Sequence, residues 1–317
     1  MGLILLWGVP FDSPMSAVHA ALMRRSARFC FLDQCETKDA KLSLFVDEKI
    51  RGFIRLREHT WRLEDIEAAY LRPYDSRRVA ESCGASPQEA CQMRSLDEGL
   101  LTWSEVTPAL VVNRPSAMAA NGAKPLQAAE ILRHGFLIPR TMVTTDPDAV
   151  VSFWETHGAI VYKSVSGTRS IVRLFTPAHR VRLPDVVHCP TQFQQYVPGT
   201  DYRVHVVGQR AFSCAVCSDA DDYRYATHDG LDVAMVAASP PGEILEACIE
   251  LCCVMGLHFA GVDLRLTPEG AWYCFEVNPS PGFTFYDEAS GGGMADALAE
   301  MLIAAASRSD QLDGDTK

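Results

Sequence analysis

The sequence lacks the motifs and segments that assign many chains to a class at first sight. None of its apolar runs reaches the roughly 18 residues of a membrane helix, and the apolar stretch at residues 3–7 lacks the basic region of a secretory signal. A P-loop (G-x-x-x-x-G-K-S/T), a G-x-G-x-x-G after the first strand, H-E-x-x-H and G-x-S-x-G are all missing. We therefore expect a cytoplasmic protein without a membrane partner, outside the P-loop, Rossmann, zinc-protease and α/β-hydrolase classes.

The chain also has fewer basic than acidic residues. Asp and Glu total 40 against 29 Lys and Arg, and the net charge of −11 argues against a nucleic-acid partner. Lysine is much rarer than arginine, so each well-placed lysine is worth examining. The 11 cysteines show no disulfide spacing, and Cys214 and Cys217 have a metal-type spacing without a second pair. We interpret the cysteines as reduced thiols, and we expect Cys214, Cys217, Cys252 and Cys253 to pack in the core.

The length and apolar content are sufficient for a sizeable core. A chain of 317 residues with 48% hydrophobic residues predicts about two domains. Strands alternate with helices at the start, which indicates a small α/β lobe with a parallel core. The elements expected in this lobe are strands at 3–8, 29–32 and 109–113, a hairpin within 43–56, and helices at 14–25, 63–70 and 88–101. Those expected after it are helices at 124–134, 146–157, 242–255 and 294–306, and strands at 138–145, 160–163, 171–175, 191–197, 201–207 and 211–217.

The most informative segment is a predicted hairpin over residues 261–278. An even-length loop pairs Asp263 with Cys274, so Asp263, Cys274, Glu276 and Asn278 share one face. Asp263 and Glu276 are then diagonal neighbours roughly 7–8 Å apart, which suits magnesium held between carboxylates and phosphate oxygens. The other face is expected to be core: Val262, Leu264, Leu266, Tyr273, Phe275 and Val277. An amphipathic hairpin with one wet face is the plainer interpretation, but the Asn-Pro-Ser-Pro-Gly run that follows favours the metal site.

Three further features accompany the hairpin, and each has an ordinary structural alternative. Lys163 ends a strand before a hydroxyl-rich loop and could hold phosphates, although a surface lysine beside a loop is the commoner case. The strand end Gln195–Val197 could offer backbone groups to an adenine ring, or could simply lead into a turn. Arg203 and Arg224, each in an Asp-Tyr-Arg triplet, could neutralise a transferred phosphoryl group or form surface salt bridges.

The order of these features resembles the ATP-grasp superfamily, and most closely its RimK-type carboxylate–amine ligases. The similarity covers roughly residues 109–306, and Phe-Glu-Val-Asn-Pro-Ser-Pro-Gly at 275–282 is its most specific part. The segments 71–74, 112–115 and 222–224 are similar to those of the subgroup that matures ribosomal peptides, including microviridin-type macrocyclases. The resemblance implies an α/β (α+β) ATP-grasp fold: a pre-ATP-grasp substrate lobe at 1–114 and two lobes, 115–195 and 196–317, that enclose ATP.

The resemblance also implies roles for individual residues. Lys163 would bind the α- and β-phosphates of ATP, Lys124 would be the family's first ATP-binding lysine, and Asp201 would bind the ribose. The adenine hinge would consist of Gln195, Tyr196 and Val197. Arg203 and Arg224 would be the catalytic arginines, and the two magnesium ions would be held by Asp263, Glu276 and Asn278. The single glycine in the loop after Lys163, Gly167, departs from the relatives, which often have more.

These roles imply an ADP-forming ligase with ATP and Mg²⁺ as cofactors. Phosphorylation converts a carboxylate into an acyl phosphate, which an amine or a hydroxyl then attacks. One hypothesis is a ligase for an amino acid or another small acid. A second is a maturase that forms ester or amide crosslinks in a precursor peptide, with Arg72, Arg114 and Arg224 as candidate peptide contacts. A third is a nucleotide-binding regulator without turnover. A homodimer is left open.

Overall fold

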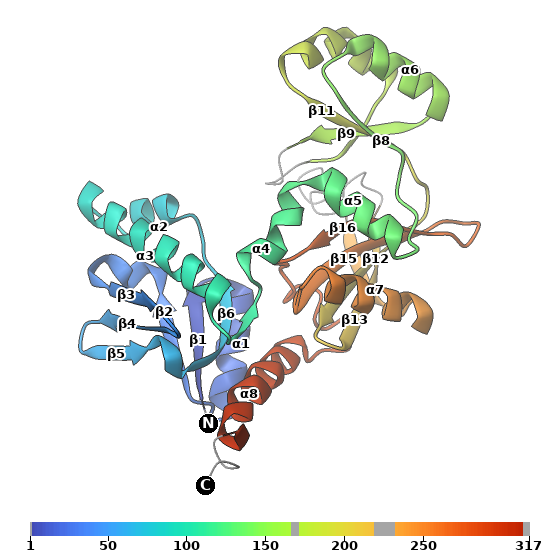
Figure 1. The fold of residues 1–317 in the computed structure, drawn as a ribbon. Coiled ribbons are helices and arrows are strands. Elements are labelled where there is room, and N and C mark those ends of the chain that lie inside the picture. The colour runs from blue at the N-terminus through green and yellow to red at the C-terminus, as the bar shows by residue number, and fades with distance from the viewer. Residues whose placement is uncertain (1, 166–170, 219–231, 313–317) are drawn as a thin grey trace.

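The chain folds into three lobes, and the third lies between the first and the second (Figure 1). The structure is a computed structural model, and it describes residues 2–165, 171–218 and 232–312. In Figure 1 the first lobe is blue to teal, the second is green to yellow and stands above the others, and the third is mostly gold to orange. The fold is thus of mixed α/β type, as predicted. The boundaries proposed at residues 114 and 195 stay a prediction.

The first lobe is built on a four-stranded parallel sheet in the order β2-β1-β6-β7. Its strands are β1 (Leu3–Gly8), β2 (Phe29–Asp33), β6 (Ile66–Arg72) and β7 (Leu110–Val112). Helix α1 (Ser13–Arg24) packs on one face and α3 (Pro87–Val106) on the other, because alternate residues of β1 point to opposite sides. Both faces of the sheet are therefore buried, as is usual for parallel strands.

One predicted element of this lobe is wrong. The helix expected at 63–70 is a 3₁₀ turn (Leu63–Asp65) followed by β6, which lies between β1 and β7. Its two alanines, Ala68 and Ala69, favour a helix in isolation, but both are fully buried in the sheet. Tertiary packing therefore overrides the local preference. A small antiparallel sheet of β3 (Lys41–Val46), β4 (Ile50–Leu56) and β5 (His59–Arg62) and the short helix α2 (Ser76–Ser82) complete the lobe.

The second lobe is an antiparallel sheet covered by one α-helix. The strand order is β10-β9-β11-β8, and the bounds are β8 (Thr141–Thr144), β9 (Ile160–Ser164), β10 (Arg173–Leu174) and β11 (Thr191–Gln195). Helix α6 (Pro147–His157) and a 3₁₀ segment (Pro177–His188) lie on one face. The core between them is apolar and includes Val150, Ile160 and Phe193.

The third lobe is a five-stranded antiparallel sheet in the order β14-β13-β12-β15-β16. Its strands are β12 (Thr200–Val207), β13 (Arg210–Ser218), β14 (Val233–Ala237), β15 (Phe259–Leu266) and β16 (Trp272–Asn278). Two helices pack against this sheet, α7 (Gly242–Val254) and α5 (Lys124–Arg133). Helix α5 follows the short α4 (Pro115–Met118) that leads out of the first lobe.

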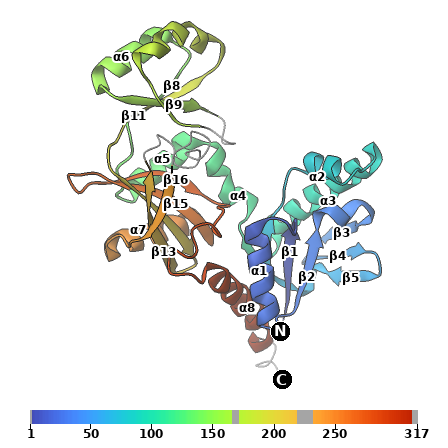
Figure 2. The ribbon, with the colours of Figure 1, turned by 180° about the vertical axis from the view of Figure 1, so that it is seen from behind.

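The last helix returns to the first lobe. Helix α8 (Met294–Leu312) lies beside α1 and the N-terminus (Figures 1 and 2). The amide of Gly2 donates a hydrogen bond to the carbonyl of Ala306 over 2.7 Å. The start of the chain and its last helix therefore share one core.

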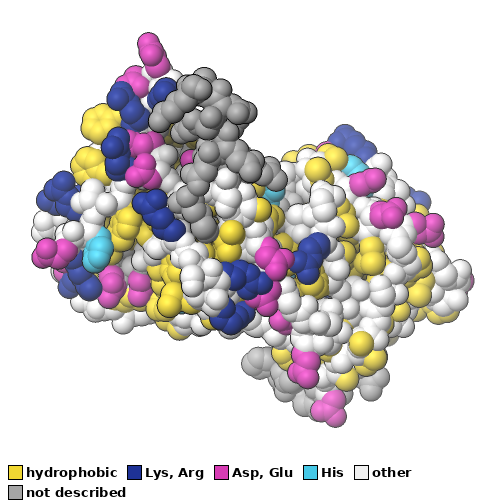
Figure 3. Space-filling view, turned by 90° about the horizontal axis from the view of Figure 1, so that it is seen from below, with side chains coloured by type: hydrophobic (Ala, Val, Ile, Leu, Met, Phe, Trp, Pro, Cys, Tyr) yellow, Lys and Arg dark blue, Asp and Glu magenta, His cyan; other side chains and the backbone are white. Residues whose placement is uncertain are grey.

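The surface carries both signs of charge. On the face seen in Figure 3, Lys and Arg side chains are interspersed with Asp and Glu side chains. Over the described ranges, no helix combines the length and the apolar character needed to cross a membrane. The expected absence of a nucleic-acid partner stays a prediction.

Candidate functional site

Two carboxylates lie directly opposite each other on neighbouring strands. Asp263 of β15 pairs with Glu276 of β16, whereas Leu264 pairs with Cys274. The register shifts between Asp263 and Leu264, so Phe275 is the extra residue of a β-bulge. The predicted pairing of Asp263 with Cys274 is therefore wrong, and the carboxylates are direct rather than diagonal neighbours.

The bulge also changes which side chains face the core. Cys274 is fully buried in the apolar cluster with Leu264 and Val277, so it does not share the carboxylate face as predicted. Tyr273 and Phe275 are half-buried and line a pocket instead of packing in the core. One extra residue breaks the alternation of side chains, and this could not be foreseen from a period of two.

Arg203 lies next to this pair, on β12. It is the register partner of Asp263, and its Nη1 donates to Asp263 Oδ1 over 2.5 Å. A Cβ atom on Gly261 would lie 2.2 Å from Arg203 Nη2, so the guanidinium occupies the space that a side chain would fill. The ring of Tyr286 lies 5.5 Å from the guanidinium carbon. Arg203 is thus fixed beside the carboxylates.

A buried histidine completes the surroundings of Arg203. The Nε2 atom of His205 lies 3.4 Å from Arg203 Nε and 3.2 Å from the carbonyl oxygen of Gly282. Burial, together with the charge of Arg203, holds the pKa of His205 well below its usual value. The imidazole is therefore neutral and adds no positive charge to the site.

Lys124 reaches the carboxylates from the first residue of α5. Its Nζ donates to Glu276 Oε1 over 2.6 Å and to Asn121 Oδ1 over 2.9 Å. The helix is joined to β16 by Gln127, whose buried amide donates to the carbonyl of Val277 and accepts from its N–H. Arg203, Asp263, Glu276 and Lys124 therefore form a row in which two cations flank two carboxylates.

Asn278 ends β16 two residues after Glu276, opposite Gly261. Its Oδ1 accepts a hydrogen bond from the Ser280 amide over 3.0 Å. Within the described ranges, no group of three or more His, Cys, Asp or Glu side chains is placed to hold a metal. Asp263, Glu276 and Asn278 offer only two carboxylates and one amide oxygen. Such a set fits magnesium, which commonly takes one or two carboxylates and completes its octahedron with phosphate and water.

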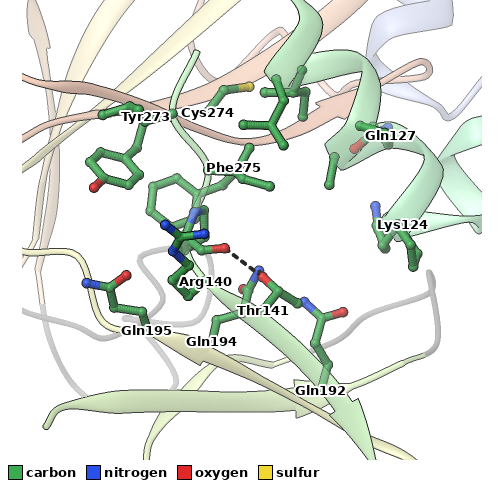
Figure 4. A pocket seen from close by; sticks show the side chains of 18 of the residues that line it. Lys124, Gln127, Arg140, Thr141, Gln192, Gln194, Gln195, Tyr273, Cys274 and Phe275 are labelled. Atoms are coloured by element: carbon green, nitrogen blue, oxygen red, sulfur yellow. Dashed lines mark hydrogen bonds between the residues drawn. The ribbon is translucent and has the colours of Figure 1, made fainter. Parts of the chain in front are cut away.

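A pocket of about 640 Å³ opens beside this row (Figure 4). Helix α5 supplies Lys124, β11 supplies its glutamines, and β16 supplies Tyr273 and Phe275 from the opposite side. The described lining residues include three cations, Lys124, Arg140 and Lys163, and no Asp or Glu. In a chain of net charge −11, this makes the pocket a local site for an anion. Its volume lies in the range of small-molecule sites.

The structure brings together some of the predicted nucleotide residues. Lys124, Lys163 and Gln195 line the pocket, but Tyr196, Val197 and Asp201 are not among its described lining residues. Both carboxylate oxygens of Asp201 accept hydrogen bonds from Arg265, over 2.7 and 2.8 Å. The same arginine donates to the Val197 carbonyl over 2.7 Å. The ribose and hinge roles of these residues stay predictions.

Three further arginines, Arg224, Arg114 and Arg140, differ in what the structure shows of them. Arg224 lies outside the described residues. Arg114 donates to backbone carbonyls at the end of α3 and after it, those of Ser104, Thr107 and Ala109. Arg140, which the sequence reasoning missed, lines the pocket where β8 begins, and its carbonyl accepts from Gln195 N over 2.8 Å. The only signal for Arg140 was its place at the start of a predicted strand.

Comparison with known families gives one match over most of this region. A model of the RimK-like ATP-grasp domain matches residues 122–302. Among curated proteins, a probable alpha-L-glutamate ligase of Vibrio cholerae is 24% identical over 280 residues, which covers 82% of this chain and 92% of that protein.

Solved structures share the fold over nearly the whole chain. The macrocyclase MdnC of Microcystis aeruginosa, bound with its precursor peptide MdnA, matches with a TM-score of 0.76 and 19% identity over 95% of this chain and 99% of that one. The ATP-grasp ligase PsnB, in complex with a phosphomimetic variant of its minimal precursor, Mg and ADP, matches with a TM-score of 0.77 and 24% identity over 96% and 98%.

Proposed function

The chain belongs to the RimK-like ATP-grasp family, and from this premise we propose that it is an ADP-forming ligase that joins a carboxylic acid to an amine. The observation that carries the proposal is the pocket lined by Lys124, Arg140 and Lys163, without a described acidic residue, beside Asp263 and Glu276. Lys124 belongs to both parts, because it lines the pocket and pairs with Glu276. The phosphates of an ATP molecule bound in the pocket would therefore extend past Lys124 to the two carboxylates.

Asp263, Glu276 and Asn278 would hold Mg²⁺ together with the phosphates of ATP. When bound, the metal neutralises charge on the phosphates and orients them for displacement. The carboxylates already lie side by side on two strands of one sheet, so little rearrangement is needed to share a cation. The relative PsnB was solved with Mg and ADP, which supports the same pair of cofactors here.

The reaction has two displacements. In the first, an oxygen of the substrate carboxylate attacks the γ-phosphorus, the bond to the β-phosphate oxygen breaks, and ADP leaves. In the second, the amine attacks the acyl carbon, inorganic phosphate leaves, and the amine loses a proton. Arg203 stands beside Asp263 with its guanidinium fixed, so its charge is in place before negative charge develops on the acyl phosphate. Lys124 and Lys163 would offset the charge of the departing phosphates.

A second candidate is a maturase that forms ester or amide crosslinks in a ribosomal peptide. The observation that favours it is the agreement of the whole fold with MdnC and PsnB, both solved with precursor peptides. The two candidates share the activation step and differ only in the acid and the nucleophile.

Phosphate release with ATP and magnesium tests both candidates. Release that needs a small acid and an amine supports the ligase for small molecules, and release only with an acidic peptide supports the maturase. Glu276→Gln should lower the rate by roughly 100-fold or more, since one preorganised charge is removed from the reacting centre. The thermal midpoint should change little, because the amide keeps the shape of the side chain.

The matched control is Glu250→Gln, because Glu250 is an exposed residue of α7. It should keep the parent rate. If Glu276→Gln retained a near-normal rate, the assignment of the metal site would be wrong. If no acid or peptide gave release above the background, the ligase proposal itself would fail.

A further inference from the structure

Three exposed aromatic side chains surround the junction between the first lobe and the carboxylate site. The exposed fractions of Phe11, Tyr74 and Phe285 are 69%, 45% and 68%. Phe11 and Tyr74 form an edge-to-face pair with ring centroids 6.0 Å apart. Phe285 packs edge-to-face on Tyr286, the ring that lies over Arg203. We call these three residues the aromatic surface.

The sheet topology places Phe11 and Tyr74 where ligands commonly bind. Phe11 follows the carboxyl end of β1 and Tyr74 follows that of β6, and the two strands are neighbours. The chain leaves β1 toward α1 on one face of the sheet and leaves β6 toward α3 on the other. In open parallel sheets, such diverging connections mark the point at which ligands are held.

A buried polar network fixes the backbone of Tyr74. The side chain of Gln34 accepts from the Tyr74 amide over 2.8 Å and donates to its carbonyl over 3.1 Å. The side-chain amide of Gln34 also donates a hydrogen bond to Asp97, whose carboxylate accepts a second one from Ser76. Gln34 and Asp97 are almost fully buried. Burial of these polar groups has a desolvation cost, and their hydrogen bonds hold the backbone of the exposed Tyr74 in one position.

A second set of contacts ties this region to the loop after Asn278. Asp12 accepts from the Tyr74 hydroxyl over 3.2 Å and from Arg72 Nε over 2.6 Å. Arg72 in turn donates to the Pro281 carbonyl over 3.0 Å. The hydroxyl groups of Ser13 and Thr284 lie 2.9 Å apart. Phe11 precedes Asp12 and Phe285 follows Thr284, so the contacts fix the aromatic surface on both sides of the junction.

Exposed aromatic rings on a rigid backbone are costly to leave in water and bind partners at a low entropic cost. We propose that the aromatic surface binds an apolar or aromatic side chain of a peptide substrate, close to the residue whose carboxylate is activated. The inference rests on the proposed ligase function and names its substrate class: a peptide rather than a free amino acid. The position of Phe285, next to the ring that covers Arg203, links this surface to the reacting centre.

Two peptides that differ in one side chain test the proposal. Gly-Gly-Phe-Glu-Gly and Gly-Gly-Ser-Glu-Gly are titrated calorimetrically into the protein with magnesium and a non-hydrolysable ATP analogue. We expect the Phe peptide to bind about tenfold more tightly, as burial of a large part of a Phe side chain provides. In Phe11→Ala/Phe285→Ala the ratio should fall to about one. Phe45→Ala, at an exposed residue of β3, should keep the tenfold ratio.

The results separate this inference from the function on which it rests. Equal binding of the two peptides, or a preference that survives the double substitution, overturns the aromatic surface as a peptide site. A double variant that changes from dimer to monomer in sedimentation also overturns it, because the surface would then bind a second copy. Phosphate release from ATP, measured with the same peptides, tests the ligase function separately. Preferential binding by a protein that releases no phosphate with these peptides or with any acid tested would retain the surface and overturn the ligase.

Discussion

At the scale of single residues, Arg203 shows how neighbouring groups fix the position of a charged side chain. Its guanidinium contacts Asp263, lies in the space left by Gly261, and is covered by the ring of Tyr286. The neutral His205 lies behind its Nε. Each of these neighbours restricts the position of the guanidinium without adding a competing cation. In the proposed reaction the arginine would therefore need little reorganisation when negative charge develops next to it.

The first residue-scale prediction concerns Gly261. In Gly261→Ala the new Cβ would overlap Arg203 Nη2, 2.2 Å away, and the guanidinium has to move. We expect kcat to fall by roughly 10- to 100-fold while KM for ATP changes little, because Lys124 and Lys163, the proposed phosphate-binding lysines, are untouched. Steady-state phosphate release measures both constants. The control is Gly242→Ala, since a Cβ on Gly242 meets no atom within 4 Å. Equal kcat values for the two variants would contradict the role of Arg203.

The predictability of the site also depends on single residues. Asp263, Glu276 and Asn278 could be selected from the sequence as candidate metal ligands, because carboxylates and an amide stand at strand positions that usually carry apolar side chains. The bulge at Phe275 could not be predicted, because one extra residue leaves no signal in an alternating pattern. The pairing of Lys124 with Glu276 joins residues 152 positions apart. Such contacts depend on how α5 is placed on the third lobe, and sequence alone does not give that placement.

Elements of the first lobe are joined through one buried acid. Asp97 of α3 accepts from Ser76 at the start of α2 and from Gln34 after β2. Burial raises the pKa of Asp97 to about 6, although both hydrogen bonds favour the ionised form. A junction between three elements therefore carries a carboxylate that is costly to ionise.

This junction predicts a dependence of stability on pH. Since the pKa of Asp97 is higher in the folded state than in the unfolded chain, where it is about 3.9, the folded state binds the proton more tightly between these values. The contribution of Asp97 is present at pH 4 and is lost as the pH rises through about 6. Relative to the parent protein, Asp97→Asn should therefore gain roughly 1–3 kcal/mol of unfolding free energy between pH 4.5 and 7.5.

Urea unfolding at the two pH values measures this difference. The same difference for Glu98→Gln, at an exposed residue of α3, should be close to zero. A variant Asp97→Asn whose stability followed the parent protein at both pH values would show that Asp97 is ionised in the fold at no cost.

Element types were largely predictable, and the exceptions have physical reasons. Capped amphipathic helices such as α6 and hairpins such as β12–β13 depend on local signals, and both lie where predicted. Strand β6 does not lie in a predicted strand, because its alanines favour a helix in isolation and form a strand only where the neighbouring strands bury them. The one predicted element of the wrong type thus depends on contacts that are distant in the sequence, whereas short elements such as β5 and α2 were not predicted at all.

At the scale of the whole molecule, Asn113 connects the first lobe to the third. Its Nδ2 donates to the carbonyls of Phe259 and Pro279, over 2.6 and 2.7 Å. Its Oδ1 accepts from the amides of His258 and Phe259, over 2.8 and 3.2 Å. One buried side chain thus joins the end of β7 to the start of β15 and to the loop after Asn278. This contact therefore helps to set the position of the first lobe relative to the carboxylate site.

Asn113→Ala should lower the free energy of unfolding by roughly 3 kcal/mol, because several buried backbone groups lose their partners. Asn113→Asp, which keeps the acceptor but loses the two donated hydrogen bonds, should also destabilise the protein. Gln92→Ala, a truncation at an exposed residue of α3, should have little effect. Urea unfolding followed by tryptophan fluorescence ranks the variants. Equal stability of Asn113→Ala and Gln92→Ala would contradict a connecting role.

The return of α8 to the first lobe has a consequence for synthesis on the ribosome. Met294, Leu298 and Leu302 belong to the same core as Ile4 and Leu6. The first strand and α1 leave the exit tunnel long before α8, which contributes to the same core. Helix α1 packs on this apolar face of the first sheet early, but the part of the core that α8 covers stays exposed until α8 is made, and chaperones that bind nascent chains have their longest opportunity there.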